Sequence, residues 1–120
     1  MIRVTFEQIE DGKTMLLKVE GHSGYDDIGK DIVCSAASIL AYTVAQAVTN
    51  LEQRKMLKKR PTLRLKEGDA VIICKPSKGG FAEAMYAYHF AQMGYALLAH
   101  NYPDFVRVKL FGGGDAADDK

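Results

Sequence analysis

Apolar residues alternate with polar ones near the start of the chain, which predicts two β-strands. They occupy every second position in residues 2–6 and again in residues 15–19, so each segment has one apolar face. Between the two segments lies Asp11-Gly12, a pair typical of tight hairpin turns because both residues tolerate a positive φ. We therefore expect an antiparallel pair of strands here.

A similar pattern returns in the second half of the chain. Residues 63–66 alternate and predict a third strand, and the apolar residues 70–74 predict a fourth, with Glu67-Gly68 as the turn between them. Residues 106–110 alternate again and predict the last strand.

Two longer segments, residues 32–50 and 81–99, have apolar residues at the spacing of an α-helix. The expected core face of the first helix comprises Ile32, Ala36, Ile39 or Leu40, Thr43, Ala47 and Leu51. The expected core face of the second comprises Ala82, Met85 or Tyr86, His89, Met93 and Leu97.

The resulting order is ββαββαβ, and it predicts a two-layer α+β domain. Tight hairpins favour antiparallel pairs, so we expect two main helices on one face of a mixed or mostly antiparallel sheet. This single domain is expected to span residues 1–111. We expect residues 112–120, which begin with three glycines and contain Asp115, Asp118 and Asp119, to form a disordered acidic tail.

Composition places the chain among ordinary globular proteins, with 48% hydrophobic and 26% charged residues among 120. No continuous apolar run approaches the roughly 18 residues typical of a membrane span. The alternating first residues do not resemble a signal peptide. We therefore expect a cytoplasmic protein with no membrane partner, in which both cysteines are free thiols.

The net charge of +1 argues against a general nucleic-acid-binding role, but the charge is unevenly distributed. We define the basic cluster as the seven cationic residues Arg54, Lys55, Lys58, Lys59, Arg60, Arg64 and Lys66. A solvated helix end and loop is the favoured interpretation of this cluster. Direct nucleic-acid contact, or contact with an acidic partner, is left open.

Cys34 is the most informative residue for function, because it falls in the first turn of the expected helix 32–50. Partial positive charge and unpaired N–H groups at a helix N-terminus stabilise a thiolate, which is the nucleophilic form of cysteine. His22, twelve residues upstream, is placed to exchange a proton with that thiol. The same helix-end N–H groups are candidates to bind the oxyanion of a tetrahedral intermediate. Three glycines make the segment around His22 a candidate mobile loop: Gly21, Gly24 and Gly29.

Two further residues lie close to this pair in the sequence. Asp31 is expected to be the N-cap of the helix, which would make Cys34 the third helical residue. Its carboxylate would either serve only as that cap or orient His22, and the pattern leaves both open. Ser38 lies one turn after Cys34 and is a candidate for the lining of a substrate groove.

Ordinary structural roles remain for each of these residues. A single cysteine near a helix start is usually a small buried side chain, and a single histidine in a loop usually lies at the surface. Cys74 is expected in the core, and His89 in the core or at an interface. The cysteines and histidines lack CxxC or HxxxH spacing, so we expect no metal site and no other cofactor.

The segments from Gly21-His22 through Gly29-Lys-Asp31-Ile-Val-Cys34 to Ser38 resemble the ribosomal-processing cysteine protease family, Prp. The order of hairpins and helices fits the same family over nearly the whole chain. The resemblance implies a catalytic dyad of His22 and Cys34. Asp31 and Ser38 match motif positions without a defined role.

The same resemblance implies an endopeptidase acting on a ribosomal protein precursor. Such enzymes remove a short N-terminal extension from large-subunit ribosomal protein twenty-seven and cut after a pair of phenylalanines. It also implies a homodimer, for which the alanine-rich and aromatic helices are interface candidates. The competing hypothesis is a non-catalytic, ribosome-associated or RNA-binding α+β module that uses the basic cluster.

Overall fold

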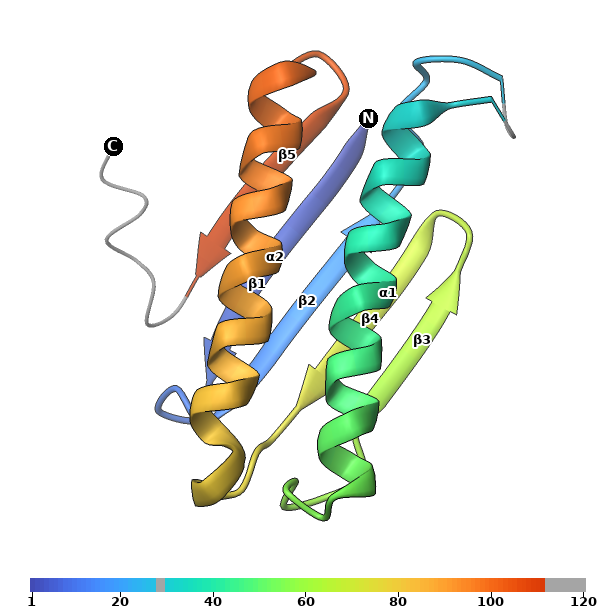
Figure 1. Cartoon of the computed structure of the whole chain (residues 1–120). Coiled ribbons are helices and arrows are strands. Elements are labelled where there is room, and N and C mark those ends of the chain that lie inside the picture. Colours follow the sequence, from blue (N-terminus) through green and yellow to red (C-terminus); the bar gives the residue numbers. More distant parts are fainter. Residues whose placement is uncertain (28–29, 112–120) are drawn as a thin grey trace.

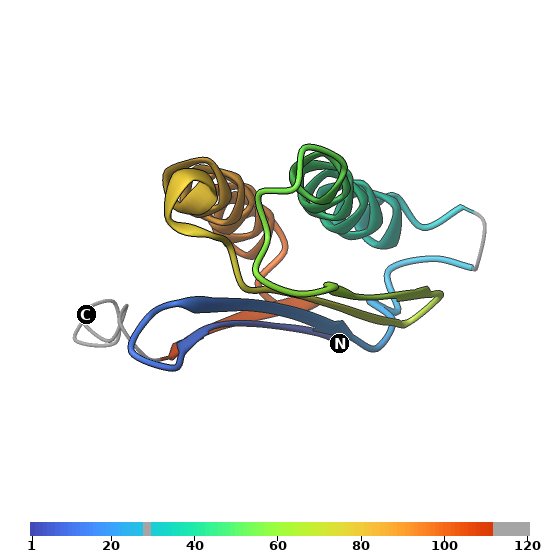
Figure 2. The same ribbon diagram turned by 90° about the horizontal axis from the view of Figure 1, so that it is seen from below.

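A five-stranded sheet covered on one face by two helices makes up the computed structural model, which describes residues 1–27 and 30–111 (Figure 1, Figure 2). The elements are β1 (Ile2–Ile9), β2 (Thr14–Glu20), α1 (Ile32–Gln53), β3 (Thr62–Lys66), β4 (Asp69–Cys74), the short 3₁₀ helix η1 (Lys78–Gly80), α2 (Phe81–Asn101) and β5 (Val106–Phe111). The predicted ββαββαβ order and two-layer α+β class are confirmed. The expected tail 112–120 and Gly29 lie outside the described residues.

The strands lie side by side in the order β3-β4-β2-β1-β5. Both hairpins, β1 with β2 and β3 with β4, are antiparallel, and β2 also pairs antiparallel with β4. Only β1 and β5 run parallel, because the chain crosses over through α2 between β4 and β5. The sheet is therefore mixed and mostly antiparallel, as predicted.

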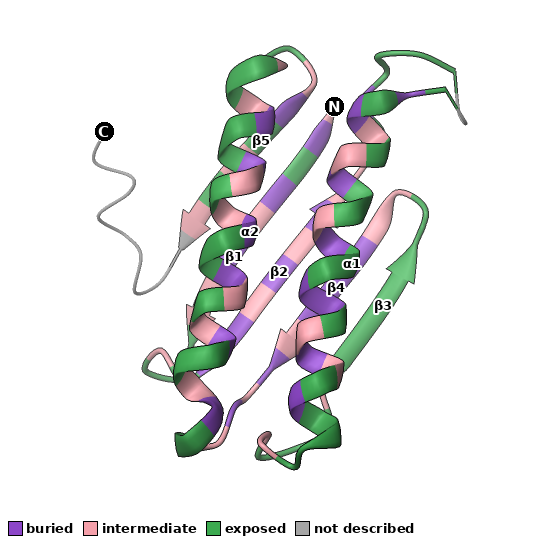
Figure 3. Cartoon of the chain, viewed as in Figure 1, coloured by how far each residue is buried: buried purple, intermediate pink, exposed green. Residues whose placement is uncertain are grey.

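The core lies between the sheet and the two helices, where buried positions face inward (Figure 3). Strand β1 contributes Ile2, Val4 and Phe6, in agreement with the predicted alternation. Because β4 lies between β3 and β2, most of its residues are buried, whereas all five residues of the edge strand β3 are exposed.

The predicted core face of α1 is confirmed in part: Leu51 is buried, and Ala36 and Leu40, the second of the two alternatives given, are half-buried against the core. Ile32 and Ile39 are 55% and 60% exposed, and Leu51 is the predicted residue that is fully buried. Burial instead follows a neighbouring stripe: Val33, Ala37, Ala41, Val44, Ala45, Val48 and Leu51. Residues 32–51 carry no charge, so the helix offers two comparable apolar stripes, and packing selected the one with smaller side chains.

The predicted core face of α2 is wrong except at Met85, the first of the alternatives Met85 or Tyr86, which is half-buried against the core. Ala82 and His89 are exposed, and Tyr86, Met93 and Leu97 are each more than half exposed. The buried residues are Ala84, Tyr88, Ala91, Tyr95 and Leu98. Tyr88 and Tyr95 can be buried because their hydroxyls donate to the carbonyls of Ile72 (3.1 Å) and Ala37 (2.7 Å).

By length and composition α1 resembles a membrane-spanning helix. In this fold its buried stripe packs on the sheet and on α2, which is the arrangement of a core helix. Gly94 of α2 allows close approach here, since a Cβ at that position would lie 2.7 Å from Cδ2 of Leu40.

Candidate active site

Asp31 caps the N-terminus of α1, as predicted. Its backbone is extended (φ −82°, ψ 103°), and Oδ1 accepts hydrogen bonds from the amides of Val33 (3.0 Å) and Cys34 (2.9 Å). Cys34 is therefore the third residue of the helix, at the end that carries partial positive charge.

The second carboxylate oxygen of Asp31 holds the segment that follows His22. Oδ2 accepts from the hydroxyl of Ser23 and from the amides of Tyr25 (3.2 Å) and Asp26 (3.3 Å). Among the described residues, no hydrogen bond joins Asp31 to His22. Of the two roles left open by the sequence, Asp31 therefore caps the helix and does not orient His22 in this structure. Asp31 thus ties the loop to the helix that carries Cys34.

These hydrogen bonds also determine the ionisation of Asp31. Its side chain is buried, and burial alone raises the pKa of a carboxyl group. The hydrogen bonds donated by Ser23, Cys34 and Asp26 outweigh burial and lower the pKa from 3.8 to about 2. Asp31 is therefore a carboxylate at neutral pH.

Ser23 is a site residue that the sequence interpretation missed. It is buried, and its amide donates to Sγ of Cys34 at 3.3 Å. The Cys34 thiol in turn lies 3.7 Å from the Ser23 hydroxyl, to which it can donate. A backbone N–H aimed at sulfur favours the thiolate. Nothing in the spacing of polar residues marked Ser23, because its contacts depend on the path of the loop.

Three of the helix-end amides that were candidates to bind an oxyanion already have acceptors within the chain. The amides of Val33 and Cys34 donate to the Asp31 side chain, and the Ser35 amide donates to the Asp31 carbonyl at 3.0 Å. Since the cap satisfies all three donors, none is free for a reaction intermediate.

His22 is exposed at the end of β2, and its ring lies against the turn between β3 and β4. A Cβ built on Gly68 of that turn would lie 2.8 Å from Nε2 of His22. Among the described residues, no hydrogen bond joins the His22 ring to the Cys34 thiol. Gly21 and Gly24 have positive φ values of 92° and 76°, a backbone conformation that glycine adopts without strain. The expected mobility of this loop stays a prediction.

His22 and Cys34 nevertheless line the same cavity, which has a volume of about 790 Å³. The cavity lies between α1 and the β3–β4 turn, and Ser38 is also in its lining. Ile39 and Tyr42 line it while remaining 60% and 49% exposed, so they form an apolar lip one to two turns beyond Cys34. Sequence periodicity assigned Ile39 to the core and so missed this role.

The chain matches a known family over almost all of its described length. Residues 1–107 match the family described as cysteine protease Prp. The protein belongs to the Prp family of cysteine proteases.

Solved structures with the same fold include relatives of known activity. A Staphylococcus aureus ribosomal processing protease Prp with a covalently linked product peptide has a TM-score of 0.70 and 20% identity, covering 92% of this chain and 99% of its own. The same Staphylococcus aureus protease with a substrate peptide has a TM-score of 0.65 and 19% identity over the same shares. SMU.848 from Streptococcus mutans has a TM-score of 0.63 and 26% identity, covering 92% and 94%. No curated protein matches the chain.

A cysteine protease needs a thiol that the substrate can reach. The two cysteines of this chain differ in their solvent exposure. Cys74 is 1% exposed in β4, as predicted, and burial raises the pKa of its thiol. Cys34 is partly exposed and lines the cavity, and its sulfur accepts a hydrogen bond from the Ser23 amide. Cys34 is therefore the candidate nucleophile of this protease.

Proposed function

We propose that this cysteine protease removes the N-terminal extension of large-subunit ribosomal protein twenty-seven in the cytoplasm, cutting after a Phe-Phe pair. Cys34 is the nucleophile and His22 is the general acid and base. The observation that carries the proposal is that both side chains line one cavity at the N-terminus of α1. Ribosomal processing is the activity of the similar Staphylococcus aureus protease.

The reaction follows from the groups around sulfur. Sγ of Cys34, which accepts a hydrogen bond from the Ser23 amide, attacks the carbonyl carbon of the scissile bond as the thiolate. His22 accepts the thiol proton and then donates it to the leaving amine. Water hydrolyses the resulting thioester, and Cys34 is regenerated.

The apolar lip supports aromatic residues in the substrate. Ile39 and Tyr42 present exposed apolar surface to the same cavity that Cys34 lines. Burying a phenylalanine side chain there contributes roughly 1.5 to 3 kcal/mol of binding. Tyr42→Ala should therefore raise KM for a Phe-Phe peptide more than for the matched Ala-Ala peptide.

The direct test is mass spectrometry of a precursor peptide that contains the Phe-Phe site. Wild type should cut after the second phenylalanine, whereas Cys34→Ala and His22→Ala should release no product. Cys74→Ala is the matched control, because it removes a buried thiol, and it should cleave at close to the wild-type rate. Cleavage by Cys34→Ala near the wild-type rate would rule out the proposal.

The non-catalytic RNA-binding hypothesis is not supported, because the chain belongs to a protease family. Within the basic cluster, Arg54 pairs with Glu83 and Arg64 pairs with Asp69 at 3.1 Å, so part of its charge is balanced by the chain itself. Direct RNA contact stays a prediction, and a binding constant that falls steeply with salt would support it.

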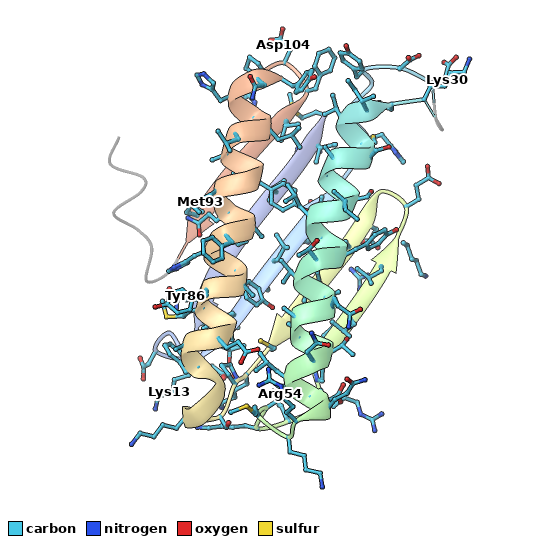
Figure 4. The ribbon with its side chains drawn as sticks, viewed as in Figure 1. Lys13, Lys30, Arg54, Tyr86, Met93 and Asp104 are labelled. Carbon is cyan, nitrogen blue, oxygen red and sulfur yellow. The ribbon has the colours of Figure 1, made fainter. Side chains whose placement is uncertain are left out.

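We also propose a homodimer formed through α2. We call the exposed residues Tyr86, Phe90, Met93 and Leu97 the outer face of α2, and each is more than half exposed. Their spacing places them in one stripe, the rings of Tyr86 and Phe90 stack, and Tyr86 and Met93 point away from α1 (Figure 4). Apolar stripes of this kind commonly mark protein interfaces.

Light scattering after gel filtration tests the dimer. Wild type should have twice the mass of one chain, and Phe90→Glu should shift it to the monomer. Gln46→Glu, at an exposed position of α1, is the charge-matched control and should stay dimeric. A monomeric wild type at micromolar concentration would overturn this assignment.

A further inference from the structure

The His22 imidazole lies directly against Gly68, where an added Cβ would press on the ring. A Cβ on Gly68 would lie 2.8 Å from Nε2, 3.0 Å from Cε1 and 3.5 Å from Cδ2 of the ring. The first distance is shorter than real Cβ contacts and the second is tight, so a side chain at this position would require the His22 ring to shift away from the turn. Gly68 also has a φ of +74°, which suits the tight turn between β3 and β4.

The backbone on both sides of His22 is held in place. The Gly21 amide donates to the carbonyl of Gly68 at 2.9 Å, which extends the pairing of β2 with β4. On the other side, Ser23 is bonded to Asp31 and to Cys34. The His22 ring can therefore change position by rotating about its own side-chain torsions, without moving the loop backbone.

Such a rotation brings the ring within reach of sulfur. The Ser23 amide nitrogen is 3.3 Å from Sγ, and the preceding Cα lies about 2.4 Å from that nitrogen by standard backbone geometry. The Cα of His22 is therefore no more than about 6 Å from Sγ, a distance an imidazole can bridge to hydrogen-bonding range. Gly68, His22 and Cys34 all line the same cavity.

We propose that Gly68 is a positioning residue that provides a resting place for the His22 imidazole in the free enzyme. A peptide that fills the cavity displaces the ring from Gly68 toward Cys34, where a ring nitrogen accepts the thiol proton. This inference rests on the proposed His22–Cys34 dyad. It assigns the completion of the dyad to a ring rotation, whereas the glycine content of the loop alone suggested a movement of residues 21–30.

A side chain at position 68 should therefore make the free enzyme more reactive. In Gly68→Ala the resting place is filled, so the ring stays beside Cys34 and the thiolate–imidazolium pair forms without substrate. Alkylation of Cys34 by iodoacetamide at pH 6 should then rise roughly tenfold, with the rate profile shifted to lower pH.

The matched control is Gly12→Ala, in the turn between β1 and β2. Its φ of +79° imposes the same backbone strain, but its Cβ would meet only Nε2 of Gln8, at an ordinary 3.8 Å. This variant should alkylate like wild type. If Gly68→Ala folds poorly, Gly68→Asn serves instead, since asparagine tolerates positive φ and still fills the space.

Three results would overturn the inference. One is an alkylation profile of Gly68→Ala that matches Gly12→Ala. Another is the same increase in the Gly68→Ala/His22→Ala double variant, which would show that the effect bypasses His22. The third is a joint loss of alkylation and cleavage in Gly68→Ala, which would mean that Gly68 holds the ring in its working position. Failure of the dyad itself would appear separately, as normal cleavage by His22→Ala.

Discussion

Replacing Asp31 with asparagine separates the two structural roles of this carboxylate. Asparagine has one acceptor oxygen, which can face the helix and keep the cap to the amides of Val33 and Cys34. Its NH₂ group then faces the amides of Tyr25 and Asp26, which are themselves donors. The helix should remain, and the loop that carries Ser23 should lose its anchor.

The expected loss of stability can be derived in two ways. Two hydrogen bonds lost at about 0.5 to 1.5 kcal/mol each give about 1 to 3 kcal/mol. The lowering of the pKa from 3.8 to about 2 corresponds to an upper value of about 2 kcal/mol, which solvent screening at the cavity mouth reduces to about 1 kcal/mol. We therefore expect Asp31→Asn to lower the free energy of unfolding by about 1 to 2 kcal/mol at neutral pH.

The difference between the two proteins should depend on pH in a defined direction. The pKa of Asp31 is lower in the folded state, so the unfolded state binds the proton more readily, and the carboxylate stabilises the fold. Its contribution is fully present above the unfolded value of 3.8 and is lost as the pH falls through about 2. Wild type and Asp31→Asn should therefore approach each other in stability as the pH is lowered from about 4 toward 2.

Urea denaturation at a series of pH values measures this difference. Asp27→Asn is the control, because it neutralises a carboxylate in the same loop that does not cap the helix, and it should change stability little. Asp31→Asn should also cleave peptide more slowly, since the loop that carries Ser23 loses its hydrogen bonds to position 31. Equal stability of Asp31→Asn and wild type at pH 7 would refute the reasoning.

Two further substitutions test the packing. Tyr95→Phe removes the buried hydrogen bond to the Ala37 carbonyl and should lower the free energy of unfolding by about 1 kcal/mol, measured in urea; no change would mean that the carbonyl is satisfied without it. Gly80→Ala places a Cβ 2.7 Å from the backbone oxygen of Met56 and should cost about 1 to 3 kcal/mol. Gly79→Ala, whose Cβ would lie 3.4 Å from the flexible end of the same Met56, should be close to neutral, and equal effects at both positions would contradict this contact.

Local patterns predicted the strands, turns and helix starts well, because each depends on neighbouring residues. Alternation located β1, Asp11-Gly12 located the first turn, and Asp31 located the start of α1. The end of α1 extends to Gln53, beyond the expected Asn50, since no glycine or proline interrupts the helix there.

The buried faces of both helices could not be predicted in the same way. In α2 the periodicity favoured the stripe of Met93 and Leu97, which the structure leaves in solvent. The stripe that packs contains Tyr88 and Tyr95, whose hydroxyls make them appear polar in a sequence pattern. Their burial depends on carbonyl acceptors in β4 and α1, which lie far away in the sequence.

The sequence by itself determined the family, the cap at Asp31 and the presence of Cys34 and His22 in one motif, because these features are local or are compared position by position. Tertiary structure decided that Ser23 faces the thiol, that the His22 ring rests on Gly68 and that Ile39 and Tyr42 form the lip of the cavity. Each of these contacts joins separate elements. They follow from how the sheet and α1 pack together, which residue spacing does not specify.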